Sequence, residues 1–311
     1  MRLPIGIHTG QQDATYAELR RVWRWADRVG FAWLSVWDHM YETPPVDGTH
    51  PSFETVSILT ALAAETRQVR IGCLVMNVGY RNPGLIAKSA CTIDHISKGR
   101  MTLGLGAGWH EMEYAAYGYT FPPPKVRLDM LEEGIQVVRS LLTQEVTTFR
   151  GKHFQVVNAY CNPKPLQPRL PIWVGGQGER RTLRVAARYA DGWNCPYVSP
   201  EDFARKCAIL EEWCRVEGRD PKQLFRSVNI GFYMGADEAD AQRKRDFLRQ
   251  QWGAQAQERE GGMLTGSPQE AIERIHQYVE AGAQQVNIAL RAPFDWRALR
   301  AFAEKVLPVF A

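Results

Sequence analysis

The sequence predicts a (β/α)8 barrel, and three observations lead to that fold class. Short apolar segments rich in β-branched and aromatic residues alternate with helical patterns along the chain. Eight such strand-like segments can be counted, which is the number that a closed barrel requires. The chain has 311 residues, a length at which one barrel of this kind is common. A doubly wound open sheet uses the same alternation, so the strand count favours the barrel.

The expected strands and helices follow from apolar content and spacing. In chain order the strands are residues 3–8, 33–38, 69–75, 101–106, 171–175, 192–195, 227–234 and 285–290. Between them, apolar residues step by three and four, as at positions 16, 19, 23 and 26 and at 128, 131, 135, 138 and 142. Ser267 and Glu270 have the spacing of a capping box around Pro268, so a helix is expected to begin there.

Two segments interrupt the alternation, and we interpret both as insertions in a single barrel domain of residues 1–311. Residues 146–169 predict a hairpin with strands at 146–149 and 154–157, followed by a proline-rich connection. Residues 235–262 are charged and then contain several glycines, which indicates a lid or an additional helix.

Composition excludes several function classes. The net charge of +4 is small for this length and acids are mixed with bases, so nucleic acid is not an expected partner. No run of 18 apolar residues and no signal-peptide core occurs, so we expect no membrane partner and a cytoplasmic location. The six cysteines include no Cys-x-x-Cys pair and are expected to be reduced.

Known metal and hydrolase motifs are missing from the sequence. His110-Glu111 lacks a second histidine at the spacing of a zinc motif, so no metal site is expected. There is no Gly-x-Ser-x-Gly elbow and no P-loop. A small-molecule substrate and a ring cofactor with a phosphate group are therefore the most economical expectation.

A glycine turn at the end of the fifth expected strand supports a phosphate site. Gly175, Gly176, Gln177 and Gly178 follow an apolar run and lead directly into a helix-like stretch. Such a turn presents backbone N–H groups beside the positive end of a helix dipole. The alternative is an ordinary strand-to-helix turn in which the glycines only relieve steric crowding. Most barrels bind phosphate after strands seven and eight, so this turn lies early.

Strand ends nominate the residues that could transfer protons. Asp38 and His39 follow the second expected strand, and a histidine beside a carboxylate there is placed for acid–base chemistry near neutral pH. His8, at the end of the first strand, is a second candidate without an adjacent acid. A purely structural role for either histidine is the alternative interpretation.

The fourth expected strand ends in alternating glycines at 104, 106 and 108. Glycine strips side chains from one face of a strand and lets a flat ring approach the backbone. The spacing is not that of a dinucleotide fingerprint, and no acidic residue follows at the required distance. Glycines that only shape the end of the barrel are the alternative.

Taken together, these segments resemble the bacterial luciferase-like superfamily of flavin- and deazaflavin-dependent oxidoreductases. The matching stretches are Asp38-His39, Tyr80-Arg81-Asn82-Pro83 with Ala87-Lys88, the stretch from Thr92 to Arg100, the stretch from Gly104 to Gly118 with Trp109, Glu113 and Tyr114, the glycine turn, and Ala190-Asp191-Gly192-Trp193. These stretches occur in the order found in that superfamily, and the resemblance as a whole covers about residues 5–290.

The resemblance implies coenzyme F420, or alternatively FMN, bound at the C-terminal face of the barrel. It implies catalytic roles for His39 as acid or base and for Asp38, which orients His39 or contacts the cofactor. It places a non-proline cis peptide at Cys73-Leu74 behind the ring and assigns Asp94 and Arg100 to bracing the barrel. The residues implied to bind the cofactor are Asp38, Cys73, Leu74, Met76, Gly106, Trp109, Met112, Gly175, Gly176, Gln177 and Gly178.

The sequence departs from the F420-dependent sugar-phosphate dehydrogenases of that superfamily. Trp109 stands where they have an acidic glutamate, and Met112 and Met76 replace polar residues. These changes favour an apolar pocket and a ketone, alcohol or enone substrate. Basic residues near the glycine turn (Arg180, Arg181 and Arg184) favour F420 modestly, because its oligoglutamate tail is acidic.

Two other functions remain open at this stage. An FMN-dependent monooxygenase that uses reduced flavin and O₂ would share the phosphate turn. A non-catalytic flavin- or deazaflavin-binding protein would share the fold, since function depends on the site. The resemblance also implies a homodimer, in which Trp23, Trp25 and Tyr117 lie either at the interface or in the core.

Overall fold

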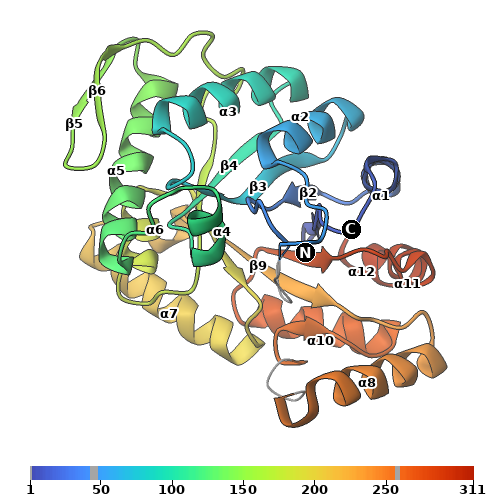
Figure 1. Cartoon of the computed structure of the whole chain (residues 1–311). Helices are drawn as coiled ribbons and strands as arrows, with labels where there is room; N and C mark the ends of the chain where they lie inside the picture. The colour runs from blue at the N-terminus through green and yellow to red at the C-terminus, as the bar shows by residue number, and fades with distance from the viewer. Residues whose placement is uncertain (1, 43–47, 256–259) are drawn as a thin grey trace.

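Eight parallel strands close into a barrel. A computed structural model describes residues 2–42, 48–255 and 260–311 (Figure 1). Pairing of the last strand with the first, with Ile288 opposite Ile7, closes the ring. The (β/α)8 prediction and all eight expected strands are confirmed, with bounds that agree or differ by one or two residues. The strands around the barrel are β1 (Ile5–Thr9), β2 (Trp33–Val36), β3 (Arg70–Asn77), β4 (Met101–Gly106), β7 (Ile172–Gly175), β8 (Gly192–Pro196), β9 (Phe225–Phe232) and β11 (Gln285–Leu290).

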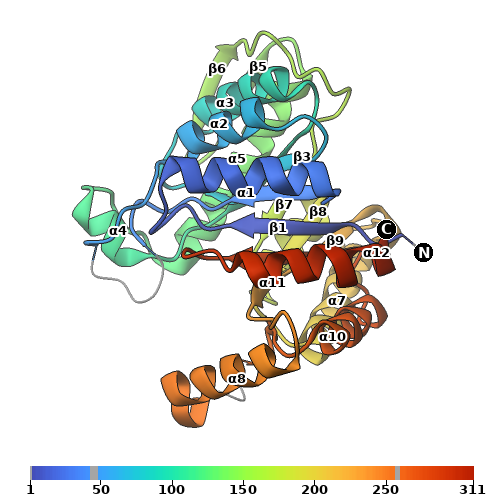
Figure 2. The same ribbon diagram turned by 90° about the vertical axis from the view of Figure 1, so that its right-hand side faces the viewer.

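Helices surround the strands and cover their outer face (Figures 1 and 2). The capping box predicted at Ser267 and Glu270 is present and begins α10. Thr15 and Glu18 form a second one at the start of α1. The helices are α1 (Tyr16–Val29), α2 (Thr55–Glu65), α3 (Pro83–Ser97), α4 (Glu111–Ala116), α5 (Pro124–Thr143), α6 (Thr182–Tyr189), α7 (Pro200–Val216), α8 (Glu238–Trp252), α10 (Pro268–Glu280), α11 (Trp296–Ala301) and α12 (Leu307–Phe310).

Stacked aromatic rings fill the N-terminal end of the barrel. Trp33 and Trp173 stack with centroids 5.1 Å apart, and Phe225 stacks on Trp173 at 5.3 Å. Room for the two indoles comes from glycine, because a Cβ on Gly72 or Gly192 would lie 2.6 Å from an indole atom. The barrel is therefore solid at this end, and any ligand site must lie toward the other.

The predicted hairpin is present, and a helix occupies part of the second interrupting segment. Strands β5 (Thr147–Arg150) and β6 (Gln155–Ala159) pair antiparallel as a hairpin. Residues 235–262 contain the additional helix α8, which lies at the edge of the molecule in both views (Figures 1 and 2). The short strand β10 (Met263–Leu264) follows this segment and extends the sheet beside β9.

Arg100 and Asp94 brace the barrel from outside, as the resemblance implied. The Arg100 guanidinium donates to the carbonyl oxygens of Ser97, Val69 and Ala63 and to both oxygens of Thr66 at 2.7–2.9 Å. These bonds join α2, β3 and α3. The Asp94 carboxylate accepts from the Leu166 and Gln167 amides and so holds the proline-rich connection.

The aromatic residues considered for an interface divide between core and surface. Trp23 is fully buried in the core and Trp25 packs against Phe31 and Trp296, whereas Tyr117 is exposed. All six cysteines are free and buried. Among the described residues, no helix has the length and apolarity to cross a bilayer, and no group of three His, Cys, Asp or Glu side chains could hold a metal ion.

Candidate active site

A cavity of about 530 Å³ opens at the C-terminal ends of the barrel strands. Its lining residues come from the ends of all eight strands or from the segments just after them. The strands of a parallel barrel run in one direction, so residues far apart in the chain meet at this face. The volume is in the range of small-molecule sites.

The glycine turn after β7 forms one end of the cavity, where Gly175 and Gly176 are part of the wall. Gly176 has a φ of 132°, a conformation that glycine adopts without steric cost. The N–H groups of Gln177, Gly178 and Glu179 donate to no acceptor among the described residues. Unpaired amides just before a helix are the donor set that phosphate binds, so these residues fit a cofactor with a phosphate group.

The β3–β4 pair carries a bulge under the cavity. The strand register shifts between Cys73 and Met76, and the Leu74–Val75 peptide bond is cis. The position expected for this bond, Cys73-Leu74, is therefore wrong by one residue. Leu74 and Val75 line the cavity. Cys73 and Met76 do not line it, because their side chains belong to the hydrophobic core and are fully buried there.

Val75 explains two of the predicted glycines. A Cβ on Gly106 would lie 2.4 Å from Val75 Cγ2, and one on Gly175 would lie 2.5 Å from Val75 Cγ1. Both positions must stay free of a side chain for Val75 to take its place in the cavity wall.

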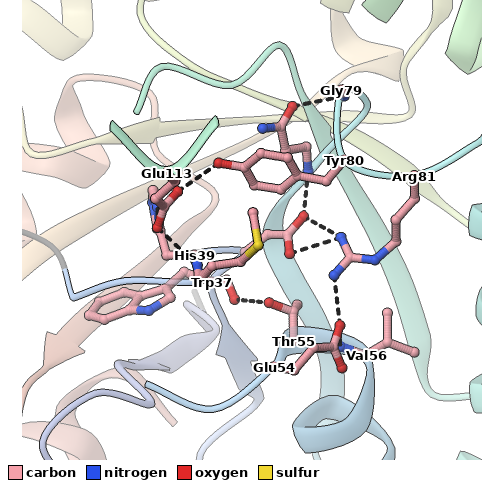
Figure 3. Close-up of polar contacts among 12 residues, drawn as sticks. Trp37, His39, Glu54, Thr55, Val56, Gly79, Tyr80, Arg81 and Glu113 are labelled. Atoms are coloured by element: carbon pink, nitrogen blue, oxygen red, sulfur yellow. Dashed lines mark hydrogen bonds and ion pairs between the residues drawn. The ribbon is translucent and has the colours of Figure 1, made fainter. Parts of the chain in front are cut away.

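His39 is held by Glu113, on α4, rather than by its neighbour Asp38. Its Nδ1 lies 3.1 Å from each Glu113 carboxylate oxygen. The Tyr80 hydroxyl donates to Glu113 Oε2 at 2.7 Å (Figure 3). The N–H groups of Met40 and Tyr41 donate to Oε1 at 2.9 and 2.8 Å. Glu113 is thus a buried acceptor with every side of its carboxylate engaged.

The protonation state of this pair follows from the contacts. Burial favours the neutral acid, but hydrogen bonds from His39, Tyr80 and the Tyr41 N–H outweigh it and hold the pKa of Glu113 below its ordinary value. An ionised Glu113 favours a proton on His39 Nδ1. The ring nitrogen left for the cavity is then Nε2, which suits His39 for proton exchange with a bound molecule.

Asp38 contacts Arg81 and Asn77 and does not hold His39. Arg81 Nη1 donates to both Asp38 carboxylate oxygens, to Oδ2 at 2.7 Å and to Oδ1 at 2.9 Å. The Asn77 N–H donates to Oδ2 at 2.7 Å. Arg81 Nη2 also donates to Glu54, the N-cap residue of α2, at 2.7 Å (Figure 3). The interpretation that Asp38 orients His39 is therefore wrong. Asp38 does lie in the cavity wall, where its ion pair fixes the loops after β2 and β3.

His8 lies in the cavity wall with Nδ1 2.9 Å from Ser35 Oγ. Burial, together with the positive charges of His39 and Arg291, lowers the pKa of His8 to about 3. The imidazole is neutral at physiological pH, so it can accept or donate a hydrogen bond there but cannot serve as a charged acid.

The remaining predicted residues lie at or outside the rim. Trp109 lines the cavity, is 57% exposed, and has its ring centroid 5.3 Å from that of His39. Met112 on α4 is partly exposed and does not line the cavity. Gln177 and Gly178 do not line it either. The latter two offer their backbone amides instead.

Several residues of the site escape sequence reasoning. Glu113 and Tyr80 stand inside the stretches that carry the resemblance, but nothing in their spacing shows that they meet His39. Asn194 and Asn229 are polar residues within apolar strands, a signal that could have identified them, and Asn194 Nδ2 donates to Asn229 Oδ1 at 3.0 Å. Arg291 follows β11 at the far wall.

Comparison with known proteins agrees with this geometry. The sequence profile described as luciferase-like monooxygenase matches residues 1–285. An uncharacterized protein of Mycobacterium tuberculosis is 30% identical over 236 residues, covering 71% of this chain and 80% of that protein. The F420-dependent glucose-6-phosphate dehydrogenase of Kineococcus radiotolerans is 32% identical over 212 residues, covering 67% and 61%.

A solved structure shows the same fold over the whole chain. The F420-dependent secondary alcohol dehydrogenase in complex with an F420-acetone adduct superimposes with a TM-score of 0.87 at 20% identity, and all of both chains is covered. The profile match spans far more than half of the sequence. The chain belongs to the luciferase-like monooxygenase family.

Proposed function

We propose that this protein is an oxidoreductase that transfers a hydride between coenzyme F420 and a small organic substrate. The observation that carries the proposal is the His39–Glu113 pair, because His39 lines the same cavity as the glycine turn and the buried Glu113 holds it there. Hydride transfer to a carbonyl carbon requires a proton at the oxygen, and the reverse oxidation of an alcohol removes that proton. His39 is placed to give or take it. Relatives named as F420-dependent dehydrogenases support this choice of cofactor.

The chain's own residues would divide the work as follows. Bound F420 supplies the hydride-carrying ring, and the protein positions that ring. The backbone amides of Gln177 and Gly178 would hold its phosphate, and the wall formed by Leu74, Val75 and Gly106 would lie against the ring. His39 Nε2 would give a proton to the substrate oxygen or take one from it, while Glu113 stabilises the imidazolium.

The remaining walls favour a ketone, alcohol or enone of modest size. Trp37, Trp109 and Tyr197 provide aromatic surface, and Asn194 and Asn229 add amide groups at the barrel end. Apolar surface with a few convergent polar groups is the usual character of a site for small organic molecules.

The second candidate is an FMN-dependent monooxygenase. The family's description favours it. Unpaired backbone N–H groups can donate to the phosphomonoester of FMN as readily as to the phosphodiester of F420. A non-catalytic carrier of either cofactor is the third candidate, and the His39–Glu113 pair argues against it because binding alone needs no proton donor.

Cofactor titration followed by turnover separates the three candidates. Purified protein should quench F420 fluorescence at micromolar concentration and leave FMN fluorescence unchanged. It should then reduce or oxidise F420 with at least one member of a panel of alcohols, ketones and enones, and His39→Gln should lower that rate with an unchanged dissociation constant for F420. Binding of FMN alone, or F420 binding with full turnover in the His39→Gln variant, would contradict the assignment.

We also propose that the protein is a homodimer. Several large apolar side chains of α3 and the hairpin region are exposed in the single chain, and burial in an interface would remove them from water. They are Leu85, Ile96, Val157 and Tyr160. Light scattering coupled to size-exclusion chromatography measures the mass directly, and a monomer at micromolar concentration would refute the proposal.

A further inference from the structure

A second, smaller hollow of about 230 Å³ lies beside the first turns of α6. It is lined by four arginines, one glutamate and one valine: Arg180, Arg181, Arg184, Arg188, Glu132 and Val185. Thr182 lines the main cavity and its chain neighbour Arg181 lines this hollow, so residues at the start of α6 contribute to both spaces. Two of the four arginines, Arg180 and Arg181, come just after the glycine turn in the chain.

Ion pairs with surrounding acids hold three of the four guanidinium groups. Arg181 pairs with Asp129 at 2.6 Å, and Arg184 pairs with Glu217 at 2.6 Å. The third, Arg188, lies 3.2 Å from Glu132 Oε1 and 3.4 Å from Glu217 Oε2. These contacts set the positions of the arginines before any ligand arrives, which lowers the ordering cost of binding.

Arg180 is the exception. It makes no ion pair with any residue in the part of the chain that the structure describes, and its side chain is exposed. Four guanidinium groups face three carboxylates (Asp129, Glu132 and Glu217), so one positive charge is left over. Such a surplus in a hollow favours a carboxylate or phosphate ligand.

We propose that this hollow binds the oligoglutamate tail of F420, an inference that rests on the proposed function. The tail is joined to the cofactor's phosphate through a lactyl group, so a phosphate held at the glycine turn would direct the tail out of the cavity there. Arg180 follows Gly178 by two positions, and the other arginines continue along α6. Each glutamate of the tail carries a free carboxylate, which matches a guanidinium. FMN ends at its phosphate and gains nothing here, so the hollow also selects between the two cofactors.

The proposal is tested with F420 that carries no glutamate and F420 that carries five or more, each titrated by fluorescence quenching. The wild-type protein should bind the long-tailed form about five- to ten-fold more tightly at low salt. That ratio should fall toward one in 0.5 M NaCl, because exposed charge pairs are screened.

Arg180→Gln should abolish most of the tail-dependent ratio and leave the affinity for tailless F420 unchanged. Arg215→Gln is the matched control, since Arg215 is an exposed arginine on α7 that pairs with Glu212 and lies outside both hollows. It should keep the full ratio.

Equal affinity for both forms in the wild-type protein would overturn the tail site, and tailless F420 binding would still uphold the proposed function. An unchanged ratio in Arg180→Gln would also overturn the tail site. Binding of FMN with no binding of either F420 form would overturn both proposals.

Discussion

Replacement of Glu113 by glutamine tests the central feature of the site with almost no change in shape. The carboxylate accepts from the N–H groups of Met40 and Tyr41, the hydroxyl of Tyr80 and Nδ1 of His39, at 2.7–3.1 Å. Glutamine offers one oxygen and one NH₂ group. The two backbone amides can only donate, so the oxygen must face them and the NH₂ must take the place of Oε2, which faces Tyr80 and lies 3.1 Å from His39 Nδ1.

The consequences for the two partners differ. The Tyr80 hydroxyl can turn and accept a bond, but His39 can accept only if its proton moves from Nδ1 to Nε2. The variant therefore loses the negative charge behind the imidazole and holds the ring in the tautomer that cannot take up a proton at Nε2. Loss of a hydrogen bond to a charged group costs about 1.5–3 kcal/mol, which corresponds to roughly a 10- to 150-fold decrease in kcat.

Two measurements check this expectation. Nitrogen-15 NMR of the histidine ring should show the proton on Nδ1 in the wild-type protein and on Nε2 in Glu113→Gln. Initial rates of F420 turnover should fall by the stated factor with an unchanged dissociation constant for F420. Tyr80→Phe is the matched control, because it removes a neutral donor to the same carboxylate and should cost only a few-fold in kcat.

A double-mutant cycle decides whether Glu113 acts through His39. If it does, the His39→Gln/Glu113→Gln variant should be about as slow as His39→Gln alone. Additive losses, or an unchanged histidine tautomer in Glu113→Gln, would refute the reasoning.

Three further predictions address the turn, the brace and the buried histidine. In Gly178→Ala the added Cβ lies 2.7 Å from Thr182 Oγ1, so the affinity for the cofactor should fall about ten-fold or more. The thermal midpoint of unfolding should change little. An affinity equal to that of the wild-type protein would mean that the turn does not hold phosphate. Arg100→Ala should lower the free energy of unfolding by about 2–4 kcal/mol through its lost carbonyl partners, measured by urea denaturation, with cofactor affinity of the folded protein retained. The pKa of His8 is lowered from 6.5 to about 3, so between these pH values the unfolded chain binds a proton at His8 that the folded chain does not. The free energy of unfolding should therefore decrease by up to about 1.4 kcal/mol per pH unit as pH falls from 6.5 toward 3. His8→Gln should flatten that part of the curve, and an unchanged slope would show that His8 is not the group responsible.

The strand ends illustrate how far local pattern carries. Alternating apolar segments place His8, His39 and the glycine turn at the same face of the barrel, because parallel strands share one direction. The resemblance adds Leu74, Gly106 and Trp109, which also line the cavity. It fails at Cys73 and Met76, because a shift in strand register turns Leu74 and Val75 into the cavity instead, and no sequence period records such a shift.

The partner of His39 shows the same limit. Adjacency in sequence favours Asp38 as the partner of His39, but successive residues of an extended segment point in opposite directions. Asp38 pairs with Arg81, and His39 contacts Glu113, which lies 74 positions further along the chain.

The amino-acid sequence by itself determined the fold class, the strand and helix order, and the places of the glycine turn and of His39 at strand ends, since each depends on short-range periodicity or on a motif of adjacent residues. Only the tertiary structure decided which carboxylate holds that histidine, which residues of the bulge face the cavity, and that four arginines surround a hollow beside the first turns of α6. Those outcomes depend on the distances between strand ends and surrounding helices that meet when the barrel closes, and one-dimensional spacing does not contain those distances.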